Sequence, residues 1–337
     1  MRQARRWLLG VGLVSGACGS PATTTSAAGT EASETGAESS ASGSQTSTSE
    51  SSGTETGGCE PVELELGSPP IHVAFVVEQS MYMAEDYAGP TRFEGIGEAL
   101  FAEPGGIAWR YDDEALGLFA YASLGDTCPS LTTTTIETGN ASVLDAVFTD
   151  LAPMGNSPAA NAIEAAAEAF DEPGTIIVLS GHNPTSCVSD SLQDSVFETR
   201  DAAAAAFELG IETRFVEVGD VADGYAQALA NIGVGLPPGG PESAPWWTPD
   251  DVDQLRAALV SILAPLRSCT LSAEDVSFVE DGELACELSL EDDEGRSHVI
   301  EAWTVPAPGV FELSGSACQA YREGAKASAS CPCEGVL

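Results

Sequence analysis

Four stretches of the chain are almost continuously apolar, which is the pattern of a β-strand buried on both faces of a sheet. They cover residues 71–77, 115–122, 175–179 and 211–218. Helical segments lie between these stretches, and strands that alternate with helices are typical of α/β proteins. The pattern therefore predicts an α/β fold with a doubly wound, mostly parallel sheet.

The predicted helices have recognisable ends. Ser157 and Pro158 suit the N-cap and the first turn of one helix. Gly210 suits the C-terminal end of a second helix, which covers residues 191–209. A third helix, over residues 249–266, has two acidic side chains near its positive end.

The pattern changes after residue 268. Short alternating runs follow, at residues 283–290, 298–305, 309–313 and 325–330. Four cysteines lie from Cys286 onward, and Cys269 stands at the junction. We therefore expect a small, disulfide-rich β module over residues 269–337, packed against an α/β domain over residues 59–268.

The first 18 residues indicate export. Three arginines precede an apolar stretch, residues 7–17, that is too short to span a bilayer. It ends in SGAC at residues 15–18, which resembles a bacterial lipobox, so we expect a signal peptide over residues 1–18 and a lipid on Cys18. Cleavage without lipidation is the alternative, because Ser15 stands where leucine is usual.

A segment poor in large apolar residues follows. Residues 19–58 contain 20 Ser or Thr and seven Gly, and they lack aromatic residues, Val, Ile and Leu. Such a segment cannot bury enough apolar surface to offset its ordering entropy. We expect a flexible tether that holds the following domains away from a membrane surface.

The charge of the chain restricts its partners. With 52 acidic and 12 basic side chains, the formal net charge is -40. Phosphate contacts need clustered Lys and Arg, so this charge argues against a nucleic-acid partner. A solvated acidic surface and specific cation binding both remain open, because bulk charge does not distinguish them.

Eight cysteines remain when Cys18 is set aside, and an even number in an exported chain favours disulfides. They are Cys59, Cys128, Cys187, Cys269, Cys286, Cys318, Cys331 and Cys333. Zinc binding is the competing interpretation, but one residue rather than two separates the last two cysteines, and no histidine lies near them.

Two pairings can be considered from the order of the elements. Cys128 and Cys187 follow the second and third apolar stretches, on loops expected at the same sheet edge, so we expect them to pair. Cys269 has three candidate partners in the C-terminal module, and the sequence does not choose among them. These candidates are Cys318, Cys331 and Cys333.

Several segments resemble the von Willebrand factor A (vWA) domain, in the order in which that family has them. Residues 73–83 (VAFVVEQSMYM) resemble its first strand and Asp-x-Ser-x-Ser loop, and residues 155–158 (GNSP) resemble its Gly-x-Thr-Pro. Residues 176–184 (IIVLSGHNP) resemble its strand that ends in Thr-Asp-Gly-x-Pro. The resemblance covers about residues 70–268 and implies a Rossmann-like domain. Residues 311–318 resemble the tail of exported, lipobox-bearing vWA proteins of bacteria.

The resemblance implies a metal-ion-dependent adhesion site at the C-terminal edge of the sheet, where open α/β sheets bind ligands. Its candidate ligands here are Glu78, Ser80 and Ser157, the last of which also suits a helix N-cap. Glu78 stands where the family has aspartate, Tyr82 where it has a second serine, and Gly181 where it has its last aspartate. Mg²⁺ demands near-ideal oxygen ligation, so we expect a degenerate site without a metal.

Mg²⁺ or Ca²⁺ binding is the alternative. Glu85 and Asp86 follow the first loop closely and could supply carboxylates to Ca²⁺, which tolerates irregular geometry. Ordinary solvent-exposed acids are the simpler interpretation of both residues.

Catalysis has little support in the sequence. Ser180 and His182 invite comparison with hydrolases, but a catalytic triad is recognised by geometry rather than by adjacency. The chain has no Gly-x-Ser-x-Gly elbow, and His72 and His298 suit structural roles. We expect that the protein is not an enzyme and that it requires no cofactor.

The expected role is therefore binding. The resemblance implies an exported, lipid-anchored adhesion or scaffold protein of the bacterial envelope, either periplasmic or at the cell surface. Its partner would be a protein or a glycan, and its contact with the membrane would be through the lipid anchor alone. A Ca²⁺- or Mg²⁺-dependent adhesin or sensor is the alternative, and a hydrolase is a weaker one.

Overall fold

The computed structural model describes residues 61–332 except 220, 274–285 and 293. These residues belong to one unit of the chain, Gly57–Leu337. The predicted signal peptide, the lipidation of Cys18, the tether, Cys59 and Cys333 lie outside the described residues. Every helix in the described part is too short or too polar to cross a bilayer.

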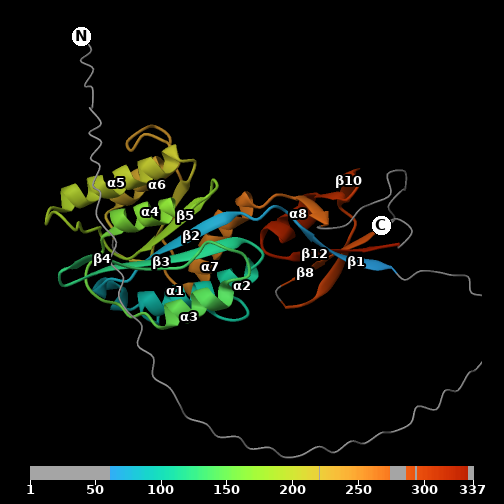
Figure 1. Ribbon diagram of the computed structural model, residues 1–337, viewed down its shortest axis with the longest axis horizontal. Coiled ribbons are helices and arrows are strands. Elements are labelled where there is room, and N and C mark those ends of the chain that lie inside the picture. Colours follow the sequence, from blue (N-terminus) through green and yellow to red (C-terminus); the bar gives the residue numbers. More distant parts are fainter. Residues whose placement is uncertain (1–60, 220, 274–285, 293, 333–337) are drawn as a thin grey trace, which may run out of the picture. The chain divides into compact units, whose positions relative to one another are not determined.

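Two β-sheets organise the described residues (Figure 1). One sheet has five strands in the order β4 (Thr127–Thr133), β3 (Ala115–Leu124), β2 (His72–Glu78), β5 (Thr175–Ser180) and β6 (Glu212–Glu217). The apolar stretches at residues 71–77, 115–122 and 175–179 form its three inner strands, β2, β3 and β5, and the stretch at residues 211–218 forms one edge, β6. Nearly every side chain of these strands is buried, as the apolar pattern predicts.

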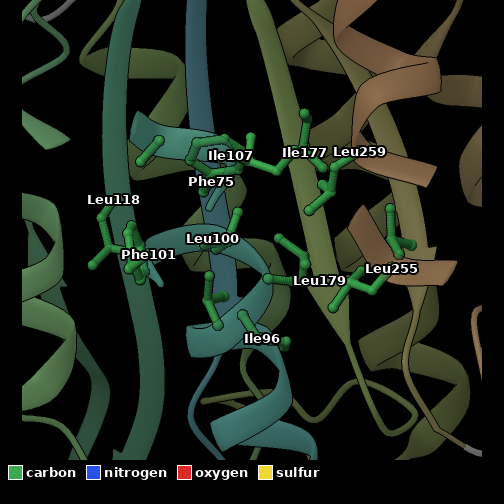
Figure 2. Close-up of a cluster of buried hydrophobic side chains, with 14 of the residues drawn as sticks. Phe75, Ile96, Leu100, Phe101, Ile107, Leu118, Ile177, Leu179, Leu255 and Leu259 are labelled. Carbon is green, nitrogen blue, oxygen red and sulfur yellow. The ribbon is translucent and has the colours of Figure 1, made fainter. Parts of the chain in front are cut away.

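Helices cover both faces of the five-stranded sheet (Figure 1). One face packs against α1 (Arg92–Phe101), α2 (Ile107–Arg110), α3 (Ala141–Thr149) and α7 (Val252–Leu263). The other packs against α4 (Ala159–Glu168), α5 (Leu192–Glu208) and α6 (Asp223–Gly233). Side chains alternate along each strand, so Phe75 enters the first core and Val76 the second. Figure 2 shows the first core, where Phe75 and Ile177 of the sheet meet Leu100 and Leu259 of the helices.

The second sheet has seven strands, in the order β10-β11-β7-β1-β12-β8-β9. Their bounds are β10 (Trp303–Ala307), β11 (Val310–Leu313), β7 (Thr270–Ala273), β1 (Val62–Gly67), β12 (Lys326–Cys331), β8 (Glu287–Glu291) and β9 (Ser297–Ile300). Strand β1 comes first in the described chain, yet it pairs with β12 and β7. Residues from both ends of the described chain therefore build this sheet. Helix α8 (Gly315–Arg322) contributes Ala317 and Tyr321 to its core.

The predicted fold class is wrong. The larger sheet is not a doubly wound parallel one: all six of its pairings are antiparallel. The five-stranded sheet is mixed, because β2 and β5 pair in parallel with their neighbours whereas β4 pairs antiparallel with β3. The apolar pattern detected strands buried on both faces, and β1 and β4 are instead partly exposed. Those two strands therefore escaped the prediction.

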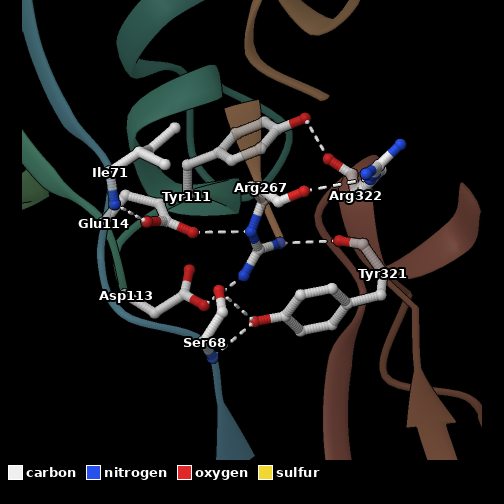
Figure 3. A network of polar contacts seen from close by, with 8 residues as sticks. All are labelled: Ser68, Ile71, Tyr111, Asp113, Glu114, Arg267, Tyr321 and Arg322. Atoms are coloured by element: carbon white, nitrogen blue, oxygen red, sulfur yellow. Dashed lines mark hydrogen bonds and ion pairs between the residues drawn. The ribbon is translucent and has the colours of Figure 1, made fainter. Parts of the chain in front are cut away.

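A buried arginine joins the segments that connect the two sheets (Figure 3). Arg267 forms ion pairs with Glu114, at 2.5 Å from its Nε, and with Asp113. Its Nη1 donates to the main-chain oxygen of Tyr321 at 2.7 Å, and its guanidinium lies over the Tyr321 ring, 4.1 Å from the centroid. The Tyr321 hydroxyl in turn accepts a hydrogen bond from the main-chain N–H of Ser68, the segment that leads from β1 to β2.

Candidate functional site

The candidate site lies where β2 and β5 end side by side. The two strands are parallel, and Val77 is paired with Leu179, so Glu78 and Ser180 reach the same edge of the sheet. A 3₁₀ helix, η1 (Met81–Ala84), follows β2, and its N-cap is Ser80. Helix α4 begins nearby, because Met81 donates its N–H to the Gly155 oxygen in the segment before that helix. The edge thus brings together the three segments that resemble the vWA loops.

Glu78 is fully buried, and four donors surround its carboxylate. Oε1 accepts a hydrogen bond from the Ser80 hydroxyl. Oε2 accepts one from the Ser180 hydroxyl at 2.6 Å and two from the N–H groups of Gly181 at 2.9 Å and His182 at 3.3 Å. A buried carboxylate needs such partners to offset its lost hydration. Glu78 therefore links the loop after β2 to the loop after β5.

An aromatic stack covers part of this edge. The rings of Tyr82 and His182 are parallel within 2° and their centroids lie 3.6 Å apart. The Tyr82 N–H donates to the Ser80 hydroxyl at 3.3 Å, which fixes the start of η1. Both rings are partly exposed, and neighbouring Met81 is 60% exposed. The position that carries a small hydroxyl in the vWA family is thus occupied by a stacked ring.

A buried arginine side chain lies at the same edge. The side chain of Arg92, from the first turn of α1, is almost entirely buried. Its Nη1 donates to the main-chain oxygens of Gly181 at 3.3 Å and Tyr82 at 3.4 Å, and it pairs with Glu85 at 2.7 Å. The main chain of Gly181 therefore donates a hydrogen bond to Glu78 and accepts one from Arg92.

There is little room for a side chain at position 181. A Cβ there would lie 2.7 Å from the Met83 sulfur and 3.3 Å from Cδ of Arg92. Gly219 is confined more tightly, since its Cβ would lie 2.3 Å from the main-chain oxygen of Gly181 and 2.7 Å from the Arg92 guanidinium carbon. The last aspartate of the family pattern cannot be accommodated here while Met83 and Arg92 keep their places.

Ser157 is also buried at this edge, and its role as helix N-cap is not observed. Helix α4 begins at Ala159 with Pro158 at the N-cap, and no side chain caps it. The hydroxyls of Ser157 and Tyr121 are buried without a hydrogen bond of good geometry. Burial raises the pKa of Tyr121 well above its usual range, the Glu78 carboxylate raises it further, and the nearby Ser157 hydroxyl opposes this shift. Tyr121 is therefore a neutral phenol at physiological pH.

The residues at this edge do not fit a divalent cation of the kind that the resemblance implies. Two buried carboxylates lie at this edge: both oxygens of Glu78 already accept hydrogen bonds, and Glu217, which is paired with Ser180 in the sheet, accepts one from the Val221 N–H. Arg92 adds a positive charge to this edge. It forms an ion pair with Glu85, which is one of the two acids considered for Ca²⁺. Asp86, the other acid, lies in an isolated bridge with Thr91 and is exposed. Among the described residues, no three His, Cys, Asp or Glu side chains form a group that could hold a metal.

The serine and the histidine of this edge are not arranged as a nucleophile and its base. The Ser180 hydroxyl donates to Glu78, and it also lies 3.0 Å from the main-chain oxygen of His182. The His182 ring stacks on Tyr82, and its Nδ1 lies 2.9 Å from the Asn183 oxygen. Nucleophilic catalysis needs the hydroxyl within reach of the imidazole nitrogen, and this structure has no such contact between the two side chains.

Three disulfides are present among the described residues. Cys128 pairs with Cys187, as their shared sheet edge predicts, and this bond joins β4 to the loop after β5. Cys269 pairs with Cys318, and Cys286 pairs with Cys331. The last two bonds tie β7 to α8 and the start of β8 to the end of β12.

Comparison with known proteins gave structural neighbours only. No protein-family model matches the chain, and no curated protein matches it. The pilus adhesin SpaC from Lactobacillus rhamnosus GG is 11% identical, with 82% of this chain and 42% of that chain covered and a TM-score of 0.47. The PilB minor pilin from Streptococcus sanguinis is 13% identical over 57% of this chain and 60% of that chain, with a TM-score of 0.44.

A third neighbour is proximal thread matrix protein 1 from the mussel byssus. It is 11% identical, with 60% of this chain and 47% of that chain covered and a TM-score of 0.40. One structure of that protein has a zinc-occupied MIDAS motif, where MIDAS stands for metal-ion-dependent adhesion site. The chain spans less than two thirds of the length of each of these three proteins.

The sequence pattern identified Glu78, Ser80 and Ser157, but it missed Arg92. The structure brings Glu78 and Ser80 into direct contact and places Ser157 near Tyr121 instead. An arginine in the first turn of a helix gives little local signal, because such residues are usually solvent-exposed. One signal was available. A cation near the positive N-terminal end of a helix is unfavourable, so an arginine at position 92 suggests a nearby anionic or carbonyl partner.

Proposed function

We propose that this chain is an exported, lipid-anchored adhesion or scaffold protein that binds a protein or glycan partner without a divalent metal. The observation that carries the proposal is the set of four donors around Glu78. They link two loops that a bound metal would otherwise connect. The edge is therefore ordered before any partner arrives, which lowers the entropy lost on binding.

The same edge offers a surface for contact. Met81 is 60% exposed, and the Tyr82–His182 stack lies beside it. Val188, next to the Cys128–Cys187 bond, is 87% exposed. Rigid aromatic and flexible methionine side chains are enriched at protein interfaces.

Calorimetric titration of the exported chain with Mg²⁺, Ca²⁺ and Mn²⁺ at fixed ionic strength tests the metal-independent part of the proposal. We expect no saturable heat, because both oxygens of Glu78 already accept hydrogen bonds and Arg92 pairs with Glu85. Saturable one-site binding that is lost in Ser80→Ala but kept in Ser330→Ala would overturn it in favour of a metal-dependent adhesin. Ser330 is a matched control, since its hydroxyl bonds to Glu63 on the other sheet.

Photo-crosslinking on intact cells tests the binding part. A crosslinking residue replaces Met81 at the edge, and a control replaces Leu209, which is 65% exposed and follows α5 at the opposite end of the parallel strands. We expect discrete adducts at position 81 that persist in EDTA, and none at position 209. Equal adducts at both positions contradict the assignment to this edge, and loss of the adducts in EDTA contradicts metal independence.

A further inference from the structure

The two sheets end in four edge strands, and three of them are protected against pairing with another chain. Strand β10 contains Pro306 and has an irregular register against β11. Strand β4 contains Pro129 and is tied down by the Cys128 disulfide. The outer side of β6 is covered by Trp247, which bonds to the main chain of Phe215 and Glu217. Proline, irregular pairing and covering loops are the usual means of blocking an edge.

Among the described residues, the fourth edge strand, β9, has none of these three devices. Its four residues contain neither proline nor lysine, and they pair regularly with β8. Val299, in this strand, is 61% exposed. A regular, exposed and uncharged edge is a template for an additional strand.

The hairpin register shows which main-chain groups of β9 face outward. The N–H of Asp292 donates to the Arg296 oxygen, so this pair is hydrogen-bonded. Antiparallel pairing alternates, and the register therefore turns the main chain of His298 and Ile300 toward β8. The N–H and C=O groups of Ser297 and Val299 point the other way, toward the place of an added strand.

A groove of about 490 Å³ lies beside this edge. Its floor and walls include Ile300 from β9, Leu290 from β8, and Ala317 and Ala320 from α8. Helix α8 thus covers the inner strands of the sheet and leaves the side chains next to β9 accessible. An open edge strand beside a helix-lined apolar groove matches the requirements of strand addition: the edge supplies hydrogen bonds, and the groove receives alternate side chains.

The charges around the groove select the occupant. Asp292 and Glu301 line it, and Glu291 and Glu294 lie on the same hairpin. Arg296 pairs with Asp292 and Glu294, and Lys326 of β12 stands opposite Glu291, so these four carboxylates outnumber the two cations beside them. A second copy of the chain would bring the same acids and a net charge of -40 to the contact. The complementary occupant is an extended segment in which apolar residues alternate with Lys or Arg.

We propose that β9 and the adjoining groove form a strand-addition site for an extended, basic and apolar segment of a partner protein. This site is separate from the edge of the five-stranded sheet and does not depend on the function proposed for that edge. A bound segment would extend the seven-stranded sheet by one strand, along roughly 13 Å of β9.

Fluorescence anisotropy of the exported chain with a labelled octapeptide of alternating valine and lysine tests the proposal. The decisive variants are Val299→Pro, which removes an outward N–H, and Val299→Ala, which keeps it. We expect Val299→Pro to weaken binding by about tenfold or more and Val299→Ala by about twofold or less. The outward direction of this N–H means that neither variant removes a bond to β8, and thermal unfolding of both variants verifies that they fold.

Two control peptides separate strand addition from simple charge attraction to an acidic protein. A peptide of alternating glycine and lysine keeps the charge but cannot fill the groove, and we expect little binding. One of alternating valine and glutamate keeps the apolar residues, and we expect repulsion. Equal binding of the glycine peptide, equal binding to Val299→Pro, or no binding of any peptide would each overturn the proposal.

A further measurement addresses self-association. Sedimentation velocity should show the wild-type chain and Val299→Pro at the same size. A wild-type dimer that dissociates in Val299→Pro would identify a second copy as the occupant and refute the basic partner segment. The crosslinking at Met81 reports on the other sheet, so either proposal can fail while the other stands.

Discussion

Replacing Arg267 with methionine should destabilise the protein far more than replacing an exposed arginine. Arg267 is 1% exposed, and Glu114, its ion-pair partner, is 2% exposed. The substitution leaves a buried carboxylate without its cation, which typically costs about 3–5 kcal/mol. It also removes the donor to the Tyr321 oxygen and the stacking on that ring, although methionine preserves most of the buried volume.

The loss should depend on pH with a definite sign. Burial raises the pKa of Glu114, and the Arg267 guanidinium is the main influence that opposes this rise. Without the cation, the pKa of Glu114 in the folded state rises further above its unfolded value. A raised pKa in the folded state favours folding at low pH, and this contribution is lost as pH rises through that pKa. The Arg267→Met deficit should therefore be largest near neutral pH and shrink as the solution approaches about pH 5.

Urea unfolding followed by tryptophan fluorescence, at both pH values, measures this effect. Adding Glu114→Gln to Arg267→Met should recover most of the stability, because the buried charge is then absent. Arg256→Met is the control: its ion pairs with Glu98 and Asp253 are exposed, and such pairs contribute about 1 kcal/mol or less. A deficit in Arg267→Met no larger than this control, or one that Glu114→Gln does not relieve, would refute the reasoning.

Three other features of the five-stranded sheet can be tested by thermal or urea unfolding of variants. Cys128→Ser or Cys187→Ser should lower stability by about 2–4 kcal/mol, and an unchanged midpoint would show that the bond contributes nothing. Gly155→Ala should cost more than about 2 kcal/mol, because φ is +66° and a Cβ would lie 1.5 Å from the Ser123 oxygen; a neutral result would contradict this backbone geometry. Glu78→Gln should cost about 1–3 kcal/mol, since its amide places a donor where donors already converge, and stability equal to wild type would exclude the four-donor arrangement.

The buried strands were predictable because their sequences report their environment directly. Strand β2 is apolar along almost its whole length, and an uninterrupted apolar run is compatible only with burial on both faces. Strand β1 carries an equally clear alternation, with Leu64 and Leu66 buried and Glu63 and Glu65 exposed. Its partners, however, are Cys331 to Ala327 of β12, at the other end of the chain. No local pattern contains that information, so the seven-stranded sheet could not be assembled from the sequence.

The sequence predicted several residues of the candidate site, but it did not predict the hydrogen bonds and ion pairs between them. The motif resemblance singled out Glu78, Ser80 and Ser157 because each matches a position in a recognisable loop. It did not indicate that Ser180 and the Gly181 N–H bond to Glu78, since this depends on the reach of one side chain across two strands. The contacts of Arg92 depend on how α1 packs against the sheet, and they are equally invisible in the sequence.

The differences between this edge and the vWA pattern that its sequence resembles are connected by geometry. Glutamate at position 78 is one methylene longer than aspartate, and that length brings its Oε2 to the N–H groups of the loop after β5. The same loop has little room for a side chain at position 181, because Met83 and Arg92 fill the space that it would take. Arg92 in turn provides positive charge close to the Gly181 peptide that Glu78 binds. An anion, a cation and a residue without a side chain thus share one peptide at this edge, so replacing Glu78 or Arg92 alone would remove a hydrogen bond from Gly181.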